Sequence, residues 1–85
     1  MTIKQATFIA RKLNAFVVKN FPFELDHDPT IKETAQDLRT HPNNISSWCW
    51  ETWDFLMANG NRAEAAELSE IQVLINHPEY VNFEI

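Results

Sequence analysis

The sequence predicts an all-α fold, a small compact bundle of about four helices with a short extended C-terminal tail, in a single helical domain over residues 1–85. Three observations predict it. Apolar residues recur at helical spacing along most of the chain, and one glycine and four prolines divide it into four such segments. Hydrophobic residues at 45% with charged residues at 22% are typical of a globular chain. A chain of 85 residues has room for one core.

The first predicted helix begins at Thr2 and runs toward Asn20, before Pro22. Thr2 and Gln5 have the spacing of a capping box, which marks a helix N-terminus. One apolar stripe along this helix predicts its core side. The stripe consists of Ile3, Ala6, Ile9, Ala10, Leu13, Phe16 and Val17.

The second predicted helix is short and starts near residues 28–30. Pro29 suits a first-turn position, and Thr30 precedes Glu33 by the spacing of a second capping box. The helix is expected to end before Pro42, because proline does not continue a helix. Its inward-facing residues are predicted to be Ile31, Ala35 and Leu38.

The third predicted helix, from about Asn44 to Asn59, carries all three tryptophans. Gly60 follows it and can take the left-handed conformation that ends many helices. At about 100° per residue, one face of this helix forms a core stripe. That face carries Ile45, Trp48, Cys49, Thr52, Trp53 and Leu56. Trp50 and Met57 lie to one side of it, so we expect them at the edge of the core.

The fourth predicted helix opens at Asn61 and ends at His77, before Pro78. Leu68, Ile71 and Ile75 form its core stripe, and Glu64, Glu67 and Glu70 flank that stripe. Residues 80–85 alternate in hydropathy, as do residues 21–25, so a small two-stranded ribbon is a further expectation.

The charge distribution indicates the class of partner. The net charge is −5, yet residues 1–20 carry Lys4, Arg11, Lys12 and Lys19 and no acid. Most of the surface would repel phosphates, so we expect no direct contact with nucleic acid and a protein partner with a basic surface instead. The one cysteine lies on an apolar helix face, which is typical of a buried thiol in a reducing compartment. The sequence has neither an apolar run long enough to cross a membrane nor the pattern of a signal peptide. We therefore expect a cytoplasmic protein without membrane contact.

No motif of a known chemistry is present in the sequence. It has no glycine-rich phosphate loop, no paired-carboxylate signature and no serine elbow, so we expect neither catalysis nor a cofactor. His27, His41 and His77 with Cys49 could complete a tetrahedral zinc site. No pair among them has the close spacing of zinc ligands, and no metal is therefore expected.

The first helix has a second face that allows three interpretations. Phe8, Ala15 and Val18 lie opposite the core stripe, among the basic residues of residues 1–20. Either the tail or the acidic fourth helix covers Phe8, or this face docks a partner. The sequence leaves both open. Contact with nucleic acid is the third and least favoured interpretation, because four basic residues lie on an otherwise acidic chain.

These observations predict a small acidic protein-binding module that modulates a larger protein, with inhibition as the expected effect. Tryptophan is enriched among interface hot spots. The candidate contacts are the apolar Phe8, Trp50 and Met57 and the acidic Glu64, Glu67 and Glu70. In general character the chain resembles phage- and mobile-element-encoded inhibitors, which would make a nucleic-acid-processing enzyme one target through phosphate mimicry. A solvated acidic surface is the simpler interpretation of those carboxylates, and self-association as a homodimer is the alternative function.

Overall fold

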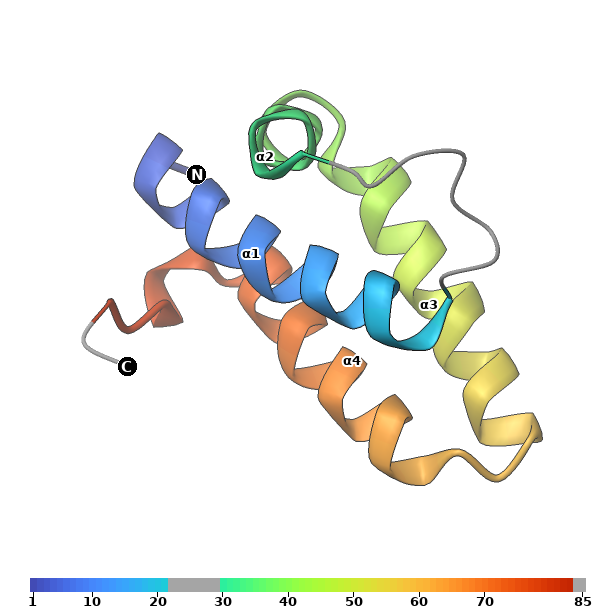
Figure 1. Cartoon of the computed structure of the whole chain (residues 1–85). Coiled ribbons are helices and arrows are strands. Elements are labelled where there is room, and N and C mark those ends of the chain that lie inside the picture. The colour runs from blue at the N-terminus through green and yellow to red at the C-terminus, as the bar shows by residue number, and fades with distance from the viewer. Residues whose placement is uncertain (22–29, 84–85) are drawn as a thin grey trace.

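The computed structural model describes residues 1–21 and 30–83. Over these residues the chain forms α1 (Ile3–Asn20), α2 (Ile31–Thr40), α3 (Pro42–Ala58), α4 (Arg62–Asn76) and the short 3-10 helix η2 (Pro78–Tyr80). Helices α1, α3 and α4 run across Figure 1, whereas α2 is seen nearly along its axis and therefore crosses them steeply. The described residues contain no strand, and the predicted all-α bundle is confirmed.

Local capping sets the start of α1. The backbone N–H of Gln5 donates to Thr2 Oγ1 at 3.1 Å, and the backbone N–H of Thr2 donates to Gln5 Oε1 at 2.8 Å. These reciprocal bonds form the predicted capping box and satisfy two donors that the helix leaves unpaired. The helix ends at Asn20, as its sequence predicts.

Thr30 caps the start of α2. Its hydroxyl oxygen accepts a hydrogen bond from the backbone N–H of Glu33 at 3.0 Å, which confirms the predicted role of these two residues. The first-turn position expected for Pro29 lies outside the described residues.

A single residue, His41, separates α2 from α3. Helix α2 ends before Pro42, as predicted, but α3 begins at Pro42 rather than near Asn44. Proline has no N–H to donate and a backbone angle already suited to a helix, so the residue that stops α2 also suits the first position of α3. This tight junction produces the steep crossing of α2.

A second tight turn joins α3 to α4. Gly60 has a φ of 78°, in the left-handed region that glycine adopts without steric cost, and this confirms its predicted role. Asn61 is the N-cap of α4 but makes no side-chain capping bond. The turn sends α4 back alongside α3, so the two helices form an antiparallel hairpin (Figure 1).

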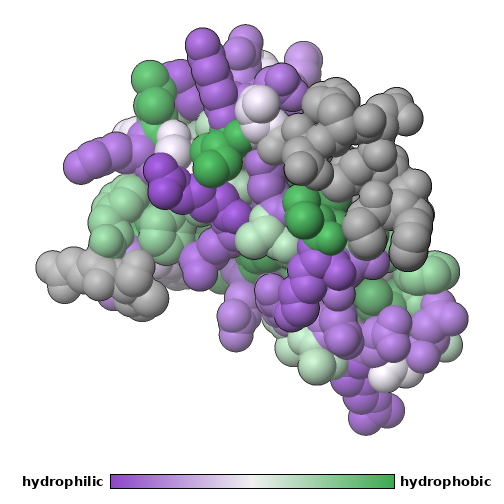
Figure 2. Space-filling view, viewed as in Figure 1, coloured by the Kyte–Doolittle hydropathy of each residue, from purple (hydrophilic) through white to green (hydrophobic). Residues whose placement is uncertain are grey.

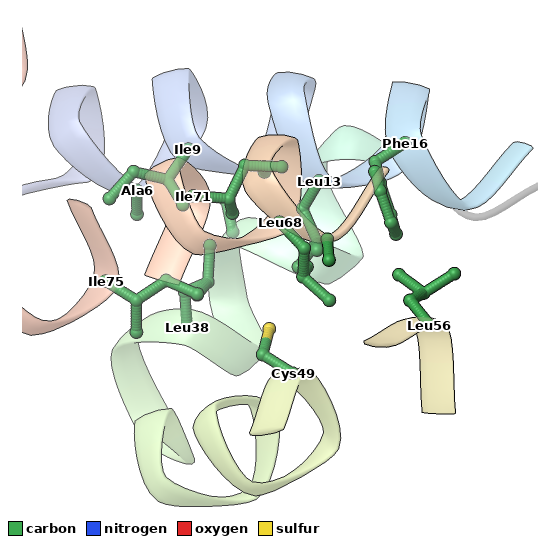
Figure 3. Packing of buried hydrophobic residues seen from close by; sticks show 13 residues of the cluster. Ala6, Ile9, Leu13, Phe16, Leu38, Cys49, Leu56, Leu68, Ile71 and Ile75 are labelled. Carbon is green, nitrogen blue, oxygen red and sulfur yellow. The ribbon is translucent and has the colours of Figure 1, made fainter. Parts of the chain in front are cut away.

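One hydrophobic cluster joins all four α-helices (Figure 3). Its buried members are Ala6, Ile9, Ala10, Leu13, Phe16, Ala35, Leu38, Cys49, Leu56, Ala65, Leu68, Ile71 and Ile75. The predicted stripes supply every buried member of this cluster except Ala65, and two stripe residues are exposed instead. Ile3 is 65% exposed and Ile31 38% exposed, because each is the first residue of its helix and lies at the edge of the packed region.

The C-terminal tail packs on α1. After η2, Val81 is half-buried against the core, and the Gln5 side-chain amide donates to the carbonyl oxygen of Pro78 at 3.2 Å. Residues 81–83 are irregular and not a strand. Residues 22–25 and 84–85 of the expected ribbon lie outside the described residues.

Candidate partner-binding surface

The tryptophans of α3 divide between two flanks of the helix. Trp48 lies on one flank, where its ring packs edge-on against Phe21 with centroids 6.4 Å apart, and both rings cover the core. Trp50, Trp53 and Met57 lie on the other flank, at the i, i+3 and i+7 spacing of one helical stripe. Buried Cys49, Thr52 and Leu56 separate the two flanks and face the core; they are three of the six residues predicted for that face.

A cavity of about 320 Å³ lies between α3 and α4, beside the second flank. Trp50 and Trp53 line it from α3 and pack edge-to-face, with ring centroids 6.0 Å apart at 77°. The other lining residues are Cys49, Leu68, Ser69, Gln72, Val73, Asn76 and His77. Apolar walls with a few polar groups are typical of recognition sites, and this volume falls at the lower end of their range.

Three side chains beside this cavity expose apolar surface. Trp50 is 55% exposed, as its predicted place at the edge of the core implies, and Met57 is 40% exposed. Val73 of α4 is 48% exposed on the far wall. Met57 does not line the cavity but extends the same stripe of α3. On the face shown in Figure 2, hydrophilic side chains predominate and apolar ones form separate areas.

Gln72 provides the least satisfied polar group of this site. Its side-chain amide nitrogen donates to Ser46 Oγ at 2.6 Å, while its Oε1 is buried without a hydrogen-bond partner. The Ser46 hydroxyl can both donate and accept, so turning the amide over would leave the nitrogen unpaired in place of the oxygen. Either way, one polar atom of Gln72 at the cavity wall lacks a partner among the residues that the structure describes, which is a costly arrangement in a buried place.

Cys49 is one of the residues that line the same cavity. Its side chain is fully buried, and Figure 3 shows the sulfur pointing from α3 into the hydrophobic cluster. Burial raises the pKa of Cys49 to about 12, because the thiolate loses its hydration there. A thiol that stays protonated is a weak nucleophile and a weak metal ligand.

The acidic candidates lie on another side of α4. Glu64 is in the first turn, where a carboxylate interacts favourably with the helix dipole, and Glu67 Oε2 lies 3.4 Å from Lys19 Nζ of α1. Glu70 is exposed and lines a separate hollow between α1 and α4. Val73 lines both this hollow and the α3–α4 cavity, so it lies between Glu67 and Glu70 on one side and the tryptophans on the other. The structure therefore places Trp50 and Met57 on one stripe of α3, whereas Glu67 is paired with α1.

Phe8 is covered by the tail. Its ring meets Phe83 edge-on, with centroids 5.8 Å apart. Lys12 lies over the Phe8 ring at 5.3 Å and Lys4 over the Phe83 ring at 5.6 Å. Of the two arrangements that the sequence leaves open for this face, the covered one is present at Phe8, while Val18 remains 43% exposed.

The histidines are dispersed in the part of the chain that the structure describes. His41 and His77 follow the ends of α2 and α4, and His77 Nδ1 lies 3.4 Å from Glu79 Oε1. Among the described residues, no group of three or more histidine, cysteine or acidic side chains is placed to hold a metal ion. His27 lies outside the described residues.

Val73 and Gln72 are the site residues that the sequence did not indicate. Val73 lies outside the core stripe of α4, on an otherwise polar side of the helix. An apolar residue at that position is the one feature of the sequence that could indicate a binding surface there. Gln72 gave none, because its burial follows from how closely α3 approaches α4. Trp53 was expected on the core face, and the structure places it half-buried at the border between core and cavity.

Comparison with protein-family models, with curated proteins and with solved structures finds no match to this chain. Among the described helices, none combines the length and the apolar character that crossing a membrane requires.

Proposed function

We propose that the protein is a binding module for a larger protein, and that the cavity between α3 and α4 receives apolar side chains from a helical segment of that partner. The observation that carries this proposal is Trp50, which is 55% exposed beside a preformed apolar cavity. Exposed tryptophans at the edge of a pocket are frequent interface hot spots.

The shape of the surface supports a helical ligand. Two antiparallel helices leave a groove between them, and the stripe of Trp50, Trp53 and Met57 runs along one wall with helical spacing. An amphipathic helix lays its apolar face into such a groove through residues at the same spacing. The arrangement extends the packing of α3 and α4 by one more helix.

The polar groups of the cavity supply selectivity. The unpaired atom of Gln72 favours a partner that brings a hydrogen-bonding side chain to the same place, since a ligand without one leaves that cost unrelieved. Ser69 and Asn76 offer further polar contacts on the α4 wall. Glu70, exposed one turn before Val73, can contact a basic residue at the rim of the partner.

The mode of action that we propose is occupation of the partner's surface, with inhibition as the result where that surface is functional. The raised pKa of Cys49 supports binding over chemistry, because the one thiol at the cavity stays protonated.

The proposal is tested by capture from a native cell lysate on the immobilised protein, followed by affinity measurement with the purified partner. Burying the exposed part of Trp50 removes roughly 100 Å² of apolar surface from water, which contributes about 2–3 kcal/mol. We therefore expect Trp50→Ala to weaken binding by about 30-fold or more in isothermal titration calorimetry. Met57→Ala is expected to have a smaller effect in the same direction.

Phe55→Ala is the matched control for this test. Phe55 is 57% exposed and belongs to the same helix, but it lies on the flank of Trp48. We expect its replacement to leave the affinity nearly unchanged. Equal losses for Trp50→Ala and Phe55→Ala, or no protein that distinguishes wild type from Trp50→Ala, contradict the proposal.

Self-association is the second candidate function, and one observation favours it. Among the described residues that line the α3–α4 cavity there is no aspartate, glutamate, lysine or arginine, so two copies of an acidic chain can meet there without opposing carboxylates. A two-fold contact would place Trp50 near its own copy. Sedimentation velocity separates the two functions: a wild-type dimer that Trp50→Ala dissociates supports self-association.

A further inference from the structure

A second and larger hollow, of about 640 Å³, lies between the first two turns of α1 and the length of α2. Its lining residues are Met1, Ile3, Thr7, Ile31, Lys32, Ala35, Gln36, Arg39 and Thr40. We call it the α1–α2 groove. It shares no lining residue with the α3–α4 cavity, so it is independent of the function proposed above.

The floor of the α1–α2 groove is apolar. Ile3 is 65% exposed and Ile31 38% exposed, and both face it from opposite helices. Ala35 of α2 also lines the groove and is 8% exposed; its side chain is a single methyl group, which leaves room for a side chain from outside. The hydroxyls of Thr7 and Thr40 bond to carbonyl oxygens of their own helices at 2.7 and 2.8 Å, so they do not require an external partner.

The rim of the groove is cationic, although the whole chain carries a net charge of −5. Lys32 and Arg39 stand seven positions apart on the same flank of α2, which is about 10 Å along the helix axis. No acidic residue that the structure describes lines the groove. Neither cation makes an ion pair with a residue that the structure describes, whereas Lys19 pairs with Glu67.

We propose that the α1–α2 groove docks an acidic amphipathic helix of a partner protein, with its apolar residues on Ile3, Ala35 and Ile31 and its carboxylates facing Lys32 and Arg39. The charge of the rim selects the sign of the partner, and walls made of two helices select a helical ligand. Carboxylates about seven residues apart on the partner match the spacing of the two cations.

A second copy of this chain matches the groove poorly. The acids of the described α-helices are Glu33, Asp37, Glu51, Asp54, Glu64, Glu67 and Glu70, and η2 adds Glu79. No two of them stand seven positions apart, and Glu67 already pairs with Lys19. A partner of different sequence is therefore the occupant that the charges favour.

The probe for this proposal is a blocked synthetic peptide of about 18 residues, a length that supports a helix. It carries a leucine stripe with glutamates seven residues apart on its borders; the control peptide has lysine at every glutamate. Isoleucine-methyl NMR of the full chain locates the contact. We expect the glutamate peptide to shift Ile3 and Ile31 and to leave the buried Ile9, Ile71 and Ile75 nearly unmoved.

Charge reversal tests the role of the rim. We expect the double variant Lys32→Glu with Arg39→Glu to weaken the glutamate peptide tenfold or more at low salt, and the loss to shrink at high salt. The double variant Arg11→Glu with Arg62→Glu changes the net charge equally, at two other exposed cations, and should bind within about threefold of wild type. Lys32→Gln with Arg39→Gln provides an intermediate case, and circular dichroism checks that each variant is folded.

Four results would overturn the proposal. The first two are binding of the lysine peptide as tightly as the glutamate peptide, and a loss of affinity in the Arg11 and Arg62 variant as large as that in the Lys32 and Arg39 variant. The third is peptide-induced shifts confined to the Trp50 and Trp53 indoles. The fourth is self-association of the wild type that Lys32→Glu with Arg39→Glu abolishes. Trp50→Ala should leave peptide binding unchanged, so that failure of the α3–α4 site and failure of this groove remain distinguishable.

Discussion

Cys49 lies in the middle of α3 with its side chain fully enclosed by the hydrophobic cluster. The thiol has no charged neighbour that would stabilise the thiolate, and desolvation raises its pKa to about 12 from an ordinary value of 9.0. In the unfolded chain the same thiol is hydrated and titrates normally. Folding therefore suppresses the thiolate at every pH between these two values.

We predict that stability falls as the pH rises above about 9. Above this pH the unfolded chain releases the Cys49 proton, while the folded chain still binds it. The tighter binding of this proton stabilises the folded state at lower pH, and that contribution to the free energy of unfolding is lost as the pH rises toward 12. At pH 10.5 the loss is about 2 kcal/mol. Urea unfolding at pH 8 and pH 10.5 measures it.

Cys49→Ala is the control for this prediction, because other groups also titrate in alkali. The variant should lose about 2 kcal/mol less than wild type between the two pH values. Equal losses in the two proteins would show that the folded thiol titrates normally. In parallel, a thiol reagent at pH 8 should modify the folded protein about a thousandfold more slowly than the urea-unfolded chain, in keeping with the thiolate fractions.

At the scale of the elements, two tight junctions determine how the helices are arranged. His41 alone connects α2 to α3, and Gly60 lies in the turn from α3 to α4. The second junction sets the antiparallel hairpin and with it the separation of the cavity walls. The positive φ of Gly60 is the one backbone feature in this hairpin that most residues cannot adopt.

We predict that Gly60→Ala lowers the free energy of unfolding by about 1 kcal/mol, the cost of the left-handed conformation for a residue with a Cβ. Apart from Gly60 itself and its two chain neighbours, no described heavy atom lies within 4 Å of the place that the Cβ would occupy, so strain and not collision is the cause. Gly60→Asn should cost less, because asparagine tolerates this conformation. Denaturant unfolding of both variants checks the order, and a larger loss for asparagine than for alanine would contradict it.

Elements whose signals are local could be predicted from the sequence. The Thr2 and Gln5 cap, the Thr30 cap and the Gly60 turn each depend on a few neighbouring residues, and all three are present. The sequence pattern predicts the start of α3 two residues late, near Asn44, because Pro42 signals the end of one helix as well as the start of the next.

The candidate site could be predicted only in part. The helical spacing of α3 placed Trp50 at the edge of the core. Gln72 and Val73 acquire their places from the approach of α4 to α3, and Phe8 is covered by Phe83 from the far end of the chain. Contacts of this kind depend on tertiary packing, which a periodic pattern does not contain.

The whole molecule has a thin margin of stability, because a chain of 85 residues is expected to have a free energy of unfolding of roughly 4–13 kcal/mol. Its one cluster takes only Ala35 and Leu38 from α2. Leu38 is 1% exposed and is therefore the main apolar attachment of that helix.

We predict that Leu38→Ala lowers the free energy of unfolding by about 3 kcal/mol, through lost burial and the cavity that remains. This loss is a large part of the total and should lower the melting temperature by more than about 10 °C. Val18→Ala serves as the control, since Val18 is 43% exposed and should cost less than about 1 kcal/mol. Thermal unfolding followed by circular dichroism compares the two, and similar shifts would contradict the single shared core.

The bond from Gln5 to Pro78 joins residues 73 positions apart, whereas α3 and α4 meet across one short turn. Closing the longer loop costs more chain entropy, so we expect the α3–α4 hairpin to assemble early in folding and the tail to dock late. All three tryptophans belong to α3. Their fluorescence in a stopped-flow experiment would thus follow the early hairpin and report little of the late docking, for which a probe near Phe83 is the appropriate reporter.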